Sequence, residues 1–176
     1  MAQKVVNTKL AFGVEGEFYD SSVKRAVNRK LAADAQFGKV VFLDANGNVT
    51  PTYDATTAAK VAGIVVNPKE YVNKSADLAA SLTAKAGNYV GVADLGRVVV
   101  KTANAAKVGY KAFTCVTAGT ATGTATTNYA LGDIVAGATA APATTDAEGG
   151  VFVEITGAMF DIVSASADEL AVLAMK

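Results

Sequence analysis

The sequence contains no histidine and no tryptophan, and its 176 residues include a single cysteine, Cys115. Without histidine, the chain cannot assemble a Ser-His-Asp or Cys-His catalytic group, nor a metal site that uses histidine ligands. One cysteine also excludes a Cys-x-x-Cys pair and any disulfide within the chain. We therefore expect a protein that is not an enzyme and that carries no cofactor and no metal.

Neither sign of charge is in excess, because 16 basic residues balance 16 acidic ones. Nucleic-acid-binding proteins usually carry a basic excess that neutralises phosphates, so we expect no nucleic-acid partner. No apolar run approaches the roughly 18 residues of a membrane span, and the first residues lack the apolar core of a secretory signal. We expect no membrane partner and a protein that is used without export.

Apolar residues are abundant, at 51% of the chain, whereas charged residues make up only 18%. Such an excess of apolar surface favours contacts between subunits. Charge is also distributed unevenly: residues 1–111 hold fifteen basic and nine acidic side chains, and residues 112–176 hold one and seven. This imbalance is compatible with two solvated faces of one domain or with complementary patches on neighbouring copies.

Short strands separated by turn signals dominate the chain after residue 36, with no alternation of strands and helices. They predict a mainly β fold, a β-sandwich or β-barrel-like domain over residues 37–176. The expected strands span 39–43, 60–66, 88–93, 97–101, 111–116, 133–136, 151–155, 160–163 and 170–175. The first pair after residue 87 reads as a hairpin turning at 94–96. Residues 75–86 fit a short helix or a further strand, and the Ala/Gly/Thr-rich stretches near 117–127 and 136–150 predict flexible loops.

The first 36 residues differ in composition from the remainder, and we interpret them as an extended N-terminal arm. Aromatic, glycine and acidic residues alternate without a period over 10–20, and four basic residues follow within 23–30. A short helical stripe on Val23, Ala26, Val27 and Leu31 is possible. Because the segment buries little by itself, we expect it to be mobile in the free protein and to become ordered against a partner.

Candidate reactive groups are few. The paired carboxylates Glu15 and Glu17, and Asp168 with Glu169, lack any sign of a dry pocket that would separate their pKa values. The loop 44–48 lacks the terminal glutamate of a calcium-binding loop, so turn formation explains it better. Cys115 lies within an expected strand and is interpreted as a buried apolar side chain.

Several stretches resemble the tailed-bacteriophage structural cement, or capsid decoration, proteins. These are Gly-Glu-Phe-Tyr-Asp-Ser-Ser at 16–22 followed by Arg25, Ala-Gly-Ile-Val-Val-Asn-Pro-Lys-Glu-Tyr at 62–71, and the strands at 94–100, 106–113 and 131–135. The resemblance covers most of residues 12–176. It implies a non-enzymatic, mainly β protein on the outer surface of a phage capsid, commonly a trimer, that clamps neighbouring capsid subunits.

The resemblance also implies partners and a location: the phage major capsid protein, further copies of the chain in a homotrimer, and a virion assembled in the host cytoplasm. We expect the arm to carry the contacts, with aromatic anchors and bases that meet acidic capsid groups. The predicted contact residues are Phe12, Glu17, Phe18, Tyr19, Lys24, Arg25, Arg29 and Lys30. The alternatives are a carbohydrate-binding or adhesin-like β module and, less favoured, a carboxylate-based hydrolase.

Overall fold

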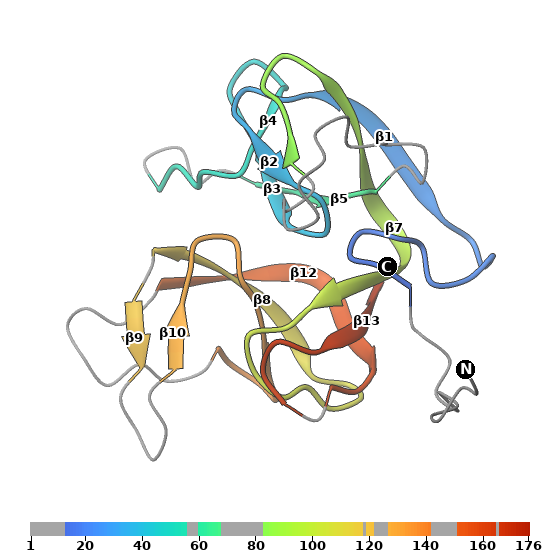
Figure 1. Cartoon of the computed structure of the whole chain (residues 1–176), viewed down its shortest axis with the longest axis vertical. Coiled ribbons are helices and arrows are strands. Elements are labelled where there is room, and N and C mark those ends of the chain that lie inside the picture. Colours follow the sequence, from blue (N-terminus) through green and yellow to red (C-terminus); the bar gives the residue numbers. More distant parts are fainter. Residues whose placement is uncertain are drawn as a thin grey trace, which may run out of the picture.

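Strands account for nearly all the regular structure, and they form two halves that share one long strand (Figure 1). The computed structural model describes residues 13–55, 60–67, 83–117, 119–121, 127–141, 151–164 and 166–176. The predicted mainly β class is confirmed, since these residues contain thirteen strands and no helix. It follows that no helix in the described ranges has the length and hydropathy needed to cross a membrane.

The strands follow one another along the chain with short connections. They are β1 (Arg25–Lys30), β2 (Ala35–Gln36), β3 (Val40–Leu43), β4 (Val49–Thr50), β5 (Val61–Val65), β6 (Thr83–Ala84), β7 (Tyr89–Lys101), β8 (Lys111–Thr117), β9 (Gly119–Ala121), β10 (Thr127–Tyr129), β11 (Ile134–Gly137), β12 (Val151–Ile162) and β13 (Leu170–Met175). The main sheet has the order β11-β8-β12-β13-β7-β5-β3-β4, with β1 also paired to β7. All of its strand pairs are antiparallel.

Strand β7 holds the two halves together. Its first part pairs with β1 on one edge and with β5 on the other, and its second part pairs with β13. The hairpin expected at 94–96 is therefore wrong, because the chain bends there without reversing. Leu95 pairs with Arg25 of β1 and Gly96 pairs with Met175 of β13, so the strand continues through 94–96, where Gly96 has a positive φ of 115°.

Each half closes on itself. In the upper half of Figure 1, a parallel bridge between Leu31 and Val49 brings the end of β1 beside β4. In the lower half, a parallel bridge between Thr102 and Ile134 brings the end of β7 beside β11. Closure leaves fewer unpaired sheet edges, and it gives two barrel-like halves, in line with the predicted fold class.

Two further expectations about elements are corrected. The helical stripe on Val23, Ala26, Val27 and Leu31 is wrong, because residues 25–30 form β1 along the edge of β7. The separate strands expected at 151–155 and 160–163 are one strand, β12, whose pairing with β8 shifts register between Glu154 and Met159. In the ambiguous stretch 75–86, residues 83–84 form β6, and residues 75–82 lie outside the described ranges.

The turn between β3 and β4 is the local structure that the sequence predicts at 44–48. The Asp44 carboxylate accepts hydrogen bonds from the backbone amides of Asn46 and Asn48, both at 2.8 Å. An aspartate that bonds its own backbone in this way stabilises a turn, which is the interpretation preferred over a calcium loop. Of the expected flexible loops, 117–127 contains β9 and the first residue of β10, and residues 122–126 and 142–150 lie outside the described ranges.

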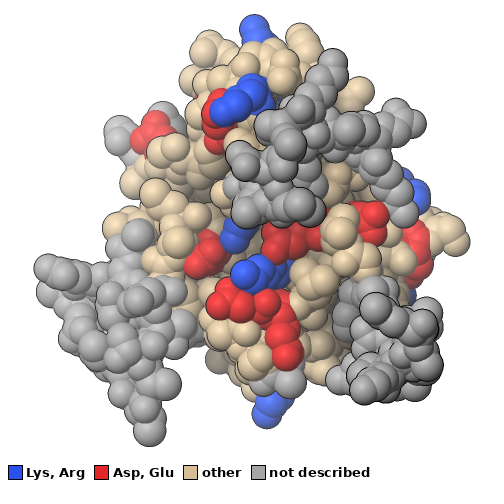
Figure 2. All heavy atoms as spheres, viewed as in Figure 1, with Lys and Arg blue, Asp and Glu red and all other residues tan. Residues whose placement is uncertain are grey.

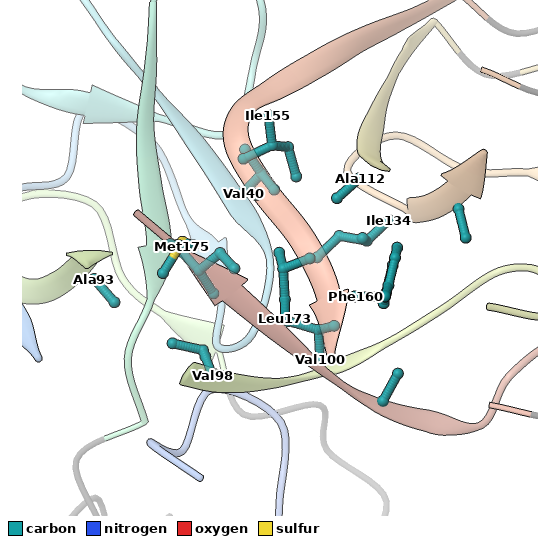
Figure 3. Close-up of a cluster of buried hydrophobic side chains, with 14 of the residues drawn as sticks. Val40, Ala93, Val98, Val100, Ala112, Ile134, Ile155, Phe160, Leu173 and Met175 are labelled. Carbon is teal, nitrogen blue, oxygen red and sulfur yellow. The ribbon is translucent and has the colours of Figure 1, made fainter. Parts of the chain in front are cut away.

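The main core crosses from one half to the other (Figure 3). Val40 and Ile64 from the upper half share it with Ile134, Phe160 and Leu173 from the lower half, and each is at most 1% exposed. A second cluster fills the upper half around Leu31 and Val65, and a third lies around Phe113 and Cys115. The shared core and the continuous β7 fix the two halves relative to each other, so the surface that they carry is rigid.

Candidate functional site

The predicted contact residues lie along one strand, β7. The segment 16–19 runs beside the second part of β7: the Gly16 amide donates to the Val99 carbonyl at 2.9 Å, and the Tyr19 amide donates to the Arg97 carbonyl at 2.8 Å. Strand β1, with Arg25, Arg29 and Lys30, lies along the first part of β7. Seven of the eight predicted residues therefore share this region, and the eighth, Phe12, lies outside the described residues.

The aromatic residues of the arm contact their own chain. Phe18 forms a bridge with Val98, is half-buried and packs against the main core. The ammonium group of Lys24 lies 5.0 Å from the centre of the Phe18 ring, a cation–π contact. Tyr19 stays 39% exposed, and the Arg97 guanidinium carbon lies 5.2 Å from its ring centre. Of these two anchors, Tyr19 is the one that still offers surface to a partner.

Arg97 connects the arm to β12, which lies two strands away from β7 in the sheet, a role that the sequence did not suggest. Its guanidinium donates to Asp20 of the arm at 2.6 Å and to Asp161 of β12. The hydrogen bond from the Ser22 hydroxyl, and then that from Arg97, hold the pKa of Asp20 below its usual value. A charged residue inside a run of valines was the only available signal, and it did not identify the partners.

The basic residues of the arm differ in how they are neutralised. Arg25 makes a bidentate ion pair with Asp94, both contacts at 2.8 Å, which raises the pKa of Arg25. Arg29 donates to the Gly47 carbonyl at 3.4 Å. Within the described residues, Lys24, Arg29 and Lys30 have no carboxylate within ion-pair distance. We call these three residues the basic strip.

Basic residues from the first part of the sequence and acidic residues from the last part form ion pairs with each other within the monomer. Four bases from residues 1–111 pair with four of the seven acids from residues 112–176, and charges of both signs mix at the centre of the face in Figure 2. The pairs are Lys39–Asp133 at 3.0 Å, Arg97–Asp161, Lys101–Asp168 at 3.0 Å and Lys111–Glu154 at 2.9 Å. Because these acids are already paired, the sequence imbalance does not require complementary patches on neighbouring copies.

An apolar groove of about 510 Å³ opens beside Arg97. Three of its apolar side chains are exposed: Val23 by 81%, Val108 by 64% and Met159 by 37%. Its lining also includes Ser22, Gly96, Arg97, Gly109, Phe160, Asp161, Ala174, Met175 and Lys176. The groove therefore lies where residues 22–23 of the arm, β7, β12 and the end of β13 meet. Sequence periodicity did not predict it.

Three of the reactive groups considered from the sequence, Cys115, Glu17 and Glu169, form hydrogen bonds within the chain. Cys115 is buried, its thiol donates to the Thr117 carbonyl at 3.1 Å, and burial raises its pKa, so it is a poor nucleophile. Glu17 accepts from the Val14 amide, and Glu169 accepts from the Ser166 amide. No group of three metal-ligating side chains occurs in the part of the chain that the structure describes.

Comparison with known proteins agrees with this arrangement. The whole chain, residues 1–176, matches the family described as "Structural cement protein (E217 gp24/Pam3 gp6)". A solved structure, "The capsid of Myoviridae Phage XM1", contains a similar chain with a TM-score of 0.60 and 14% identity, covering 99% of this chain and 97% of that one. No curated protein matches. The resemblance read from the sequence is confirmed: the chain belongs to the phage structural cement protein family, a non-enzymatic structural component of the virion capsid.

Proposed function

We propose that the protein binds the outer surface of the phage capsid as a homotrimer and bridges neighbouring copies of the major capsid protein. In this proposal the arm, residues 1–36, makes the contact with its exposed side chains, while residues 16–19 and β1 stay paired with β7. The observation that carries this proposal is the basic strip, three cations of the arm that have no carboxylate partner in the described structure. The same arm also carries Tyr19, which is 39% exposed.

The stabilising effect follows from mass action. A protein that binds only the assembled shell lowers the free energy of that state, and many copies on one shell act together. Basic residues at the rim of an interface raise the association rate and orient the two partners. Their contribution to binding decreases as salt screens their charge. Tyrosine and arginine are also the side chains that most often dominate interface energetics.

The test is co-sedimentation with empty capsids. A triple variant, Lys24→Gln, Arg29→Gln and Lys30→Gln, should weaken binding at least tenfold and should reduce its salt dependence. The matched control, Lys60→Gln, Lys107→Gln and Lys176→Gln, removes the same charge from exposed positions outside the arm and should bind normally. Equal binding by the two triple variants would reject the basic strip as the contact.

A further inference from the structure

The apolar groove combines exposed apolar side chains with carboxylates at its edge, so a segment that is both apolar and basic fits it. Val23, Val108 and Met159 project into solvent around it, and a contiguous exposed apolar surface of this kind marks a binding site. Two carboxylates, Asp20 and Asp161, share the single guanidinium of Arg97 at its edge. Because the pKa of Asp20 is lowered, that carboxylate is ionised at neutral pH, and this edge holds two acidic side chains against one guanidinium, with Lys176 also in the groove lining.

The first twelve residues of the chain have the complementary composition. Met-Ala-Gln-Lys-Val-Val-Asn-Thr-Lys-Leu-Ala-Phe contains two bases, Lys4 and Lys9, and no acid. It also supplies bulky apolar residues immediately beside each base, such as Val5 and Leu10. A segment of this length spans up to about 40 Å when extended, which is more than a groove of this size requires.

The described chain begins nine residues before the groove lining, since its first residue is Gly13 and the first lining residue is Ser22. A turn over 14–17 is closed by the Glu17 amide, which donates to the Val14 carbonyl at 3.2 Å. Residues 17–22 then lead to Ser22 and Val23 at the groove.

We propose that residues 1–12 dock in the apolar groove of their own chain. Their apolar side chains cover Val23, Val108 and Met159, and one of the lysines lies at the carboxylates of Asp20 and Asp161. Docking shields the exposed apolar surface of the free protein. This inference goes beyond the proposed function and does not depend on it, because it concerns a single chain without capsid.

Paramagnetic relaxation in the full-length protein tests this proposal. A nitroxide is attached at Val6→Cys in a Cys115→Ala background, with the valine and methionine methyl groups carrying ¹³C. We expect the Met159 and Val108 methyl signals to broaden at least fivefold more than those of Val135, a buried residue of the third cluster. The same label at Asn46→Cys, in the exposed β3–β4 turn, should leave the groove signals unchanged.

Two further arms make the result decisive. A mixture of spin-labelled chain without ¹³C and unlabelled ¹³C chain reports only contacts between molecules, and it should show no broadening at the groove. Val108→Glu should reduce the Met159 broadening at least fivefold, whereas Leu131→Glu, at a similarly exposed site on another loop, should not. Absent broadening, broadening in the mixture, or an unaffected Val108→Glu signal would each overturn the proposal, and none would bear on capsid binding.

Discussion

At the scale of single residues, two positions are determined by contacts with distant parts of the chain. Gly63 in β5 lies so close to β7 that a Cβ atom there would be 2.0 Å from the Ala93 carbonyl oxygen. Arg97 has partners 77 residues before it and 64 residues after it. A sequence pattern reports the local periodicity of apolar and polar residues, and neither of these long-range contacts changes that periodicity. This is why sequence reasoning identified the strands that contain both residues but not what either residue does.

Gly63→Ala should be among the most destabilising small substitutions. Besides the close approach to Ala93, its φ of 142° is unfavourable for any residue with a side chain. We expect a loss of more than about 3 kcal/mol in the free energy of unfolding, measured by urea denaturation. The matched control is Gly47→Ala, where φ is 79° and nothing lies within 4 Å, with an expected loss of about 1 kcal/mol. Equal losses would contradict the close contact.

The attachment of the arm through Asp20 should weaken in acid. Its folded-state pKa is lowered by the Ser22 hydroxyl and by Arg97, whereas an unfolded aspartate titrates near about 3.9. The stabilisation is therefore complete above about pH 4 and is lost as the pH falls through the folded-state value. We expect wild type to melt at a higher temperature than Asp20→Asn at neutral pH, with the difference shrinking as the pH falls below about 4 and through the folded-state pKa of Asp20. A difference that persists at low pH would contradict the assignment.

At the scale of elements, the sequence predicted strands well where an apolar run is bounded by turn residues. Strands β3, β5, β8, β11 and β13 all match such runs. It failed where a local signal depends on a distant partner. Asp94-Leu95-Gly96 has the composition of a turn, but β1, β5 and β13 pair with the chain on both sides of it and keep it extended. The stripe in 23–31 fits helix or strand, and the free edge of β7 decides between them.

The arm should therefore respond differently to two deletions. Removing residues 1–30 takes away β1 and the ladder of residues 16–19, which exposes one edge of β7 and the part of the main core against which Phe18 packs. We expect insoluble protein or a melting temperature lowered by more than about 10 °C. Removing residues 1–12 leaves every described contact in place and should preserve a cooperative melt. Circular dichroism measures both, and an unchanged melt after removal of residues 1–30 would show that β1 is dispensable.

At the scale of the whole molecule, the two closed halves behave as one body because they share β7 and the main core. A structural protein on a shell gains from such rigidity, since force applied to the arm is transmitted to the core through paired strands. Folding pairs four bases from the first part of the sequence with four acids from the last part, whereas the three cations of the basic strip have no carboxylate partner in the described residues. If the proposed function holds, recognition of a capsid surface and cohesion of the monomer use different charged residues.

The same distribution of surface leads to the prediction about assembly. The chain is 51% apolar, and bulky apolar residues outside the groove are also exposed, among them Tyr89 by 74%, Leu131 by 58% and Val151 by 53%. Because the charge imbalance is neutralised internally, we expect subunits to associate through apolar surface, giving a homotrimer whose mass changes little with salt. Light scattering at tens of micromolar measures the free state, and cross-linking on capsids measures the bound state, since trimers that form only on the shell would escape the first measurement. A monomer in both states would contradict the homotrimer. A trimer that dissociates at high salt would show that charged patches, and not apolar surface, hold the subunits together.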